Sequence, residues 1–211
     1  MKRRLTVRKS GGTQTSRRAL KGEIAYLAAR LIAEHGITSF AVAKQKASRQ
    51  MGVSEQGLLP DNREIEAALR SHQGIFQNNS QPQECHVLRQ VAVDVMRWLD
   101  RFSPWLVGGV LTGLANRFSR VELEIVLDDT KRLEMFLFNE GTLFDTRVEH
   151  AIQVQAAHTR NDILIYEFSF DEFPVTIACY QHHAMRGTRH PRKSLKYAHA
   201  QLMDVEQLLA D

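Results

Sequence analysis

The sequence predicts an α+β fold, in which a helical N-terminal segment precedes a small mixed β-sheet flanked by helices. Two observations support this class. As far as about residue 102, apolar residues recur every three or four positions, which is the helical spacing. Beyond Pro104 the spacing changes to the alternation of a half-buried strand, and helical and strand segments then follow in turn.

The bulk composition predicts a soluble protein with one good core. The chain has 211 residues, of which 43% are hydrophobic and 25% charged. No apolar run approaches the ~20 residues that span a bilayer, and no apolar segment follows the basic N-terminus as in a secretory signal. Cys85 and Cys179 are isolated from each other and suit a reducing compartment. We therefore expect a cytoplasmic protein without a membrane partner.

Three regions are expected along the chain: a basic flexible tail (1–22), a helical region (23–80) and an α+β domain with a C-terminal helix (83–211). The tail holds eight Lys and Arg residues and no acid, whereas the whole chain has a net charge of +4. Such a tail is either a solvated arm or a contact for the phosphates of RNA or DNA. The candidate nucleic-acid contacts, which include a second basic cluster, are Arg3, Arg4, Arg17, Arg18, Arg189, Arg192 and Lys193.

The helical segments are marked by their apolar faces and by the residues that begin or end them. Asp61 and Glu64 have the spacing of a capping box, which predicts a helix start after Pro60. Gly36 and Gly52 follow two of the apolar runs, as expected at helix ends. The helices predicted in this half of the chain cover about residues 21–35, 41–51, 62–76 and 84–102.

The second half of the sequence predicts strands with one polar, solvent-exposed face. Residues 121–127 alternate between apolar and polar side chains. Asp128, Asp129 and Thr130 then precede a helix over 131–140. Further strands are expected over 143–156, 162–170 and 173–180, the last two joined as a hairpin by the acidic turn 171–172, and a helix over about 192–209 closes the chain.

The chemistry-bearing stretch lies at residues 105–125. An apolar strand runs into Gly108 and Gly109, where the backbone can approach a phosphate group closely. Glu122 and Glu124 lie two apart on the next strand, so both carboxylates project from the same face. Carboxylate oxygens so placed are ligands for Mg²⁺, which would bridge them to the phosphates of an NTP.

This stretch resembles the DNA polymerase β-like nucleotidyltransferase superfamily. That superfamily has an apolar residue, Gly, then Gly or Ser, about ten connecting residues, and a strand reading acid-apolar-acid-apolar. Gly108-Gly109 and Glu122-Leu123-Glu124-Ile125 match the pattern, and the resemblance covers about residues 84–185. From Leu58 onward the chain is also similar to a group of uncharacterised bacterial nucleotidyltransferase-like proteins. The resemblance implies transfer of a nucleotide from an NTP to an acceptor hydroxyl, with Mg²⁺ held by the two glutamates.

The acidic motif departs from the superfamily in two places. Arg120 occupies the position where the first acid should follow residues 116–119. Thr176 stands where the third acid is expected, although Glu167 and Asp171 lie nearby in the sequence. The motif therefore fits an atypical transferase or a degenerate relative that binds nucleotide or nucleic acid. A plainer interpretation is a solvated strand face on which Arg120 pairs with the glutamates.

The N-terminal region offers a function of another class. Residues 29–36, followed by Ala47, Gly52 and Val53, are similar to the start of TetR-type helix-turn-helix regulators. In that motif a second helix enters the major groove of DNA. Gly57 and Pro60 interrupt the segment that would read the bases. A helix-turn-helix DNA-binding protein thus remains the alternative to a nucleotidyltransferase-like protein.

Overall fold

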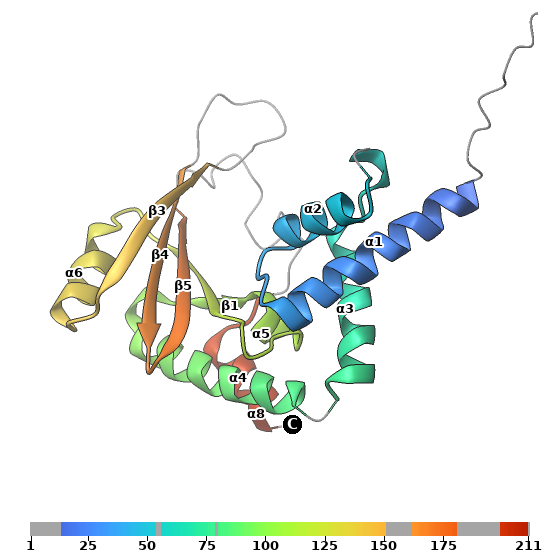
Figure 1. Cartoon of the computed structure of the whole chain (residues 1–211). Coiled ribbons are helices and arrows are strands. Elements are labelled where there is room, and N and C mark those ends of the chain that lie inside the picture. Colours follow the sequence, from blue (N-terminus) through green and yellow to red (C-terminus); the bar gives the residue numbers. More distant parts are fainter. Residues whose placement is uncertain (1–13, 54–55, 79, 151–161, 181–198, 211) are drawn as a thin grey trace, which may run out of the picture. The chain divides into compact units, whose positions relative to one another are not determined.

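The computed structural model describes residues 14–53, 56–78, 80–150, 162–180 and 199–210. The chain divides into two compact units, Met1–Gln77 and Asn78–Asp211 (Figure 1). The first unit is helical where it is described, and the second contains a five-stranded mixed sheet with helices. The predicted α+β class is confirmed.

The first unit consists of helices that follow one another closely. They are α1 (Gln14–His35), α2 (Phe40–Gln50), the short 3-10 helix η1 (Gln56–Leu58) and α3 (Asn62–Phe76). Its core is made by apolar side chains of α1 and α3, which are exposed by 4% or less: Ile24, Ala28, Leu31, Ile65 and Leu69. The helical spacing of these positions is the pattern from which the helices were predicted.

Two local predictions in this unit have different outcomes. The capping box is present: the carboxylate of Asp61 accepts from the Glu64 backbone N–H at 2.8 Å, and the Glu64 carboxylate accepts from the Asp61 backbone N–H at 2.7 Å. By contrast, α1 begins at Gln14, inside the segment expected to be a flexible tail. Arg, Ala, Leu and Lys after position 16 are all good helix formers, so a polar, basic composition does not prevent helix formation here.

The second unit alternates helices and strands. In chain order they are α4 (Gln81–Trp98), η2 (Asp100–Phe102), β1 (Trp105–Val107), α5 (Gly108–Thr112), β2 (Val121–Val126), α6 (Lys131–Asn139), β3 (Phe144–His150), β4 (Asp162–Phe170), β5 (Phe173–Tyr180) and α8 (Leu202–Ala210). The predicted strands and helices are present with shifted ends, and residues 151–156 of the strand predicted over 143–156 lie outside the described residues. The part of the predicted C-terminal helix before residue 199 lies outside the described residues.

The strands are ordered β1-β2-β5-β4-β3. Only β2 and β5 pair in parallel; the other neighbours are antiparallel. The predicted hairpin joins β4 and β5, and Asp171 and Glu172 at its turn both have positive φ. At the β1 side of the sheet, Leu106 and Ala200 exchange two backbone hydrogen bonds of 2.9 and 3.0 Å. Thus the chain just before α8 also lies at the β1 edge.

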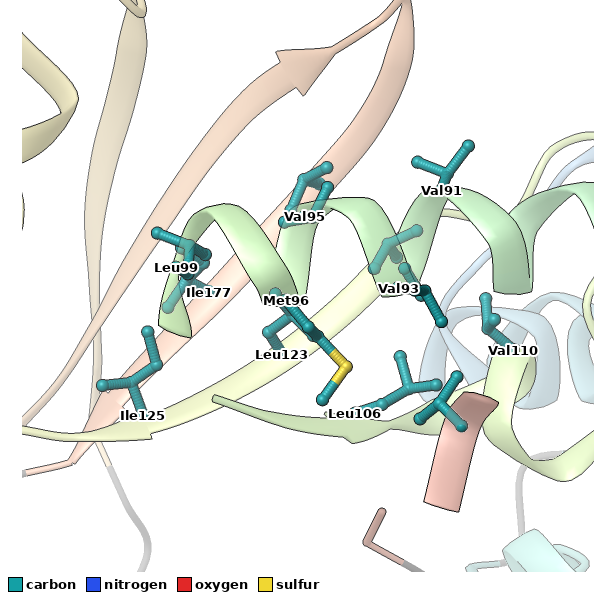
Figure 2. Close-up of a cluster of buried hydrophobic side chains, with 14 of the residues drawn as sticks. Val91, Val93, Val95, Met96, Leu99, Leu106, Val110, Leu123, Ile125 and Ile177 are labelled. Atoms are coloured by element: carbon teal, nitrogen blue, oxygen red, sulfur yellow. The ribbon is translucent and has the colours of Figure 1, made fainter. Parts of the chain in front are cut away.

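One face of the sheet packs against helices. Figure 2 shows Val95 and Met96 of α4, and Leu99 directly after it, beside Leu123 and Ile177 of the sheet. Side chains of α6 and α8 complete the same buried cluster. Since strand side chains alternate, burying the odd-numbered residues of β2 directs the even-numbered ones to the opposite face, and the burial along β2 alternates accordingly.

Candidate functional site

Arg120, Glu122 and Glu124 share the face of β2 that is turned away from the α4 core. The intervening Val121 and Leu123 are fully buried, whereas the two glutamates are half-buried. This arrangement confirms the alternation predicted from the sequence. The side chains of the neighbouring strands that share this face then decide what the carboxylates can do.

Glu122 lies directly against Gly108. Val107 pairs with Glu122 in the β1–β2 ladder, so Gly108 comes just beyond the carboxylate at the end of β1. Gly108 has a φ of +74°, and a Cβ at this position would stand 1.8 Å from the Oε2 atom of Glu122. Both facts require glycine: the backbone is left-handed, and the carboxylate occupies the volume of a side chain. The sequence-predicted glycine and carboxylate are therefore brought together.

Gly109 has a different role. A Cβ there would meet the backbone nitrogen of Ala115 at 3.5 Å, an ordinary contact. Its carbonyl accepts from the backbone N–H groups of Leu114 and Ala115 at 2.9 and 3.0 Å, which closes the turn after α5. The geometry therefore fixes the connection from β1 to β2 but does not itself require glycine at this second position.

Glu124 is held by two side chains that the sequence analysis did not single out. The hydroxyl of Tyr180 donates to one carboxylate oxygen at 3.2 Å, and Nε2 of His199 lies 3.1 Å from the other. The side chains of Glu124 and His199 are exposed by only 15% and 12%. Trp105 contacts the His199 ring edge to face, at 6.4 Å between ring centroids. Glu124 is thus engaged at both oxygens, whereas the carboxylate of Glu122 forms no hydrogen bond or ion pair with a side chain of the described residues.

Burial dominates the acidity of both glutamates. It raises the pKa of Glu122 above its usual value, and the positive charge of Arg120 partly offsets this effect. Burial also raises the pKa of Glu124; the Tyr180 hydrogen bond lowers it and the negative charge of Glu122 raises it. The pKa of Tyr180 is raised too, first by burial and then by the adjacent Glu124. The site therefore disfavours two unneutralised carboxylates.

Arg120 reaches across the sheet rather than along its own strand. Its Nη1 donates to Oε1 of Glu167 at 2.8 Å and to Oγ1 of Thr176 at 3.2 Å. Arg147 lies on the other side of Glu167, with its Nε at 3.5 Å from Oε1. The predicted ion pair within the motif is therefore replaced by a pair with β4, although Arg120 still acts electrostatically on Glu122.

The register explains this pairing. Glu122 is opposite Thr176 on β5, and Thr176 is opposite Glu167 on β4. The three side chains form one row on the open face. Thr176 thus occupies the neighbouring-strand position where the resemblance implies a third acid, and Glu167 lies one strand further. Asp171, the other nearby acid considered from the sequence, lies at the β4–β5 turn instead.

The donor set does not fit a site for two magnesium ions. Within the described ranges, no group of three or more His, Cys, Asp or Glu side chains could hold a metal ion. Both oxygens of Glu124 already have partners, and a guanidinium stands beside Glu122. Mg²⁺ needs several oxygen ligands in near-octahedral geometry. Mg²⁺ binding therefore stays a prediction from the resemblance.

The candidate nucleic-acid contacts are only partly within the described chain. Arg17 and Arg18 lie on α1 and are exposed. The remaining candidates lie outside the described residues: Arg3, Arg4, Arg189, Arg192 and Lys193. The structure thus gives no arrangement for a basic surface.

The segment similar to helix-turn-helix regulators contains α2, a turn at 51–53 and then only the three-residue η1 before α3 begins at Asn62. A helix that reads the major groove normally extends over more than one turn. Residues 54 and 55 lie outside the described ranges. The geometry therefore gives no specific support to this alternative.

None of the helices in the described ranges is both long enough and apolar enough to cross a membrane. No protein-family model, curated protein or solved structure matches the chain. The arrangement of the side chains themselves is therefore the basis for any functional proposal.

Proposed function

We propose that residues 78–211 form a nucleotidyltransferase-like domain that binds a nucleotide at the end of β1, beside Gly108 and Glu122. One observation carries the proposal: the glycine predicted to lie at the phosphates and the carboxylate predicted to lie beside them are in direct contact. The alternating order of strands and helices after α4 also agrees with what the resemblance implies.

On a strand face that is simply exposed to solvent, the carboxylates would be fully hydrated. Glu122 and Glu124 are half-buried, and this burial raises the pKa of both carboxyl groups. Desolvated groups that converge on a backbone turn are typical of a binding site. The guanidinium of Arg120, on the same face, supplies a positive charge for a phosphate group.

Nucleotide binding and nucleotide transfer depend on different features of the site. The missing third acid at Thr176 affects the chemistry of transfer, whereas the contact of Gly108 with Glu122 affects the shape of the site. Nucleotide binding therefore follows from the geometry more directly than catalysis does. Transfer to an acceptor hydroxyl remains a prediction from the resemblance, tested in the same experiment.

The test is calorimetric titration of the full chain with each NTP, followed by incubation with labelled NTPs to detect transfer. We expect saturable binding of at least one NTP, weakened at least tenfold in Gly108→Ala. Gly141→Ala, which creates the same kind of backbone strain at an exposed helix end, is the matched control. Equal binding by both variants, or no binding of any NTP, contradicts the proposal. Salt-sensitive binding of duplex DNA without nucleotide binding would favour the helix-turn-helix alternative.

A further inference from the structure

We infer that Arg120 is a built-in counter-ion of the acidic sheet face, so that this site binds its ligand without a divalent cation. The inference deepens the proposed function and rests on it for the identity of the ligand. The role of Arg120 itself rests on its contacts and its charge. Its guanidinium lies among the side chains of Glu122, Thr176 and Glu167, which belong to three neighbouring strands.

Arg120 has a defined position on the open face of the sheet. Arg120 precedes β2 directly and shares the face of Glu122, two residues away. One nitrogen of its guanidinium binds both Glu167 and Thr176, at 2.8 and 3.2 Å. A side chain that bridges two strands in this way has a defined placement over the row, rather than a solvated one. Its side chain is exposed by 33%, so it remains accessible to a ligand.

The open face of the sheet carries several negative charges near Arg120. Glu122 and Glu124 of β2 and Glu167 of β4 project from this face, and Asp145 of β3 is opposite Glu167. Negative charge gathered in this way attracts cations even though, among the described residues, no three carboxylates converge as metal ligands. Arg120 neutralises Glu167 by direct contact, and through space it partly offsets the rise that burial causes in the pKa of Glu122. A metal ion entering the row would meet this fixed positive charge at close range, where the protein screens it poorly.

Arg120 has further N–H donors with which it can bind a phosphate group. A guanidinium presents five N–H donors, and Arg120 uses one nitrogen for its described contacts. Its planar fork suits phosphate oxygens, which a metal ion would otherwise neutralise. The fixed arginine can thus perform one task of the cation, neutralising phosphate charge. It does not perform the other, which is to activate an attacking oxygen.

The experiment has two arms. In the first, Mn²⁺ is titrated into the full chain without nucleotide and followed by electron paramagnetic resonance. We expect no binding at millimolar Mn²⁺ for the native protein and for Arg120→Lys, which keeps the charge. Arg120→Gln should bind Mn²⁺ at least tenfold more tightly. Arg147→Gln, which removes the other charge beside Glu167, is the matched control and should behave like the native protein.

In the second arm, the native protein is titrated with ATP in EDTA and in Mg²⁺. We expect dissociation constants within about threefold of each other, whereas Arg120→Gln should lose at least tenfold in EDTA. The inference is overturned if native binding of ATP requires Mg²⁺. It is also overturned if Arg120→Gln has no higher affinity for Mn²⁺ than the native protein. GTP, CTP and UTP are titrated in the same two buffers. An absence of binding of all four nucleotides in both buffers would contradict the proposed function instead, and the Mn²⁺ arm would still decide the role of Arg120.

Discussion

Replacing Gly108 by alanine tests the contact on which the site is built. The new methyl group would stand 1.8 Å from Oε2 of Glu122, so the carboxylate must withdraw by more than an ångström. The backbone must also hold alanine at a φ of +74°. The left-handed conformation alone costs about 1–2 kcal/mol for a residue with a Cβ. The displaced carboxylate adds a coupling energy, for which contacting residues typically show roughly 0.5–3 kcal/mol.

A double-mutant cycle separates these two effects. Gly141→Ala has the same backbone strain, with a φ of +70° and no atom within 4 Å of the new Cβ. We expect Gly108→Ala to lower the free energy of unfolding by roughly 1 kcal/mol more than this control does. Adding Glu122→Ala should remove the excess, because the obstructing carboxylate is then absent.

The assay is urea denaturation followed by tryptophan fluorescence. Both tryptophans of the chain, Trp98 and Trp105, belong to the unit that contains the sheet, so the signal reports on the unfolding of this unit alone. The reasoning is refuted if the two alanine variants lose equal stability, or if the effects of Gly108→Ala and Glu122→Ala are simply additive.

Two further predictions concern stability. Burial raises the pKa of Glu122, so its folded form favours the proton, and the stability it contributes at low pH is lost as the pH rises through that raised value. Glu122→Gln should therefore gain in melting temperature over the native protein as the pH goes from 4 to 8. A difference in melting temperature that stays constant with pH would contradict the burial of Glu122. Leu123→Ala empties a position exposed by 1% and should lower the free energy of unfolding by about 2–5 kcal/mol in urea denaturation. Met135→Ala, at a position exposed by 65%, should change it by less than about 0.5 kcal/mol, and equal effects would refute the assignment of the core.

The features that could be predicted from the sequence are those set by near neighbours in the chain. The capping box depends on Asp61 and Glu64, three residues apart, and it forms as predicted. The alternation of β2 and the hairpin turn at 171–172 are equally local. Their physical causes, side-chain period and turn conformation, act before any tertiary contact is known.

The partners of the site residues could not be predicted in the same way. Glu124 meets His199, which is 75 residues away in the sequence, because the chain pairs Ala200 with β1 before entering α8. No spacing rule links these positions. Tyr180 is different, since its place on β5 two alternations beyond Thr176 puts both on one face. The sequence contained this signal, but without the strand order it could not be connected to Glu124.

Arg120 shows how tertiary structure changes a local expectation. Side chains two apart on one strand stand about 6.5 Å from each other, whereas adjacent strands are about 4.8 Å apart. Glu167 is two strands away from Arg120, and the long arginine side chain spans this distance over Thr176 of the intervening strand. The pairing with Glu167 depends on β5 lying between β2 and β4, and that order is a property of the whole fold.

Nuclear magnetic resonance of the ¹⁵N-labelled full chain during titration with NTP tests the central claim most directly. The account predicts that the backbone amides of Gly108, Gly109 and Glu122 shift first and furthest as the nucleotide saturates its site. The amide of Gly141, beyond the end of α6, should not move. Saturable shifts that leave these three amides unchanged and fall in the Met1–Gln77 unit, or no shifts at all, would contradict a nucleotide site at the end of β1.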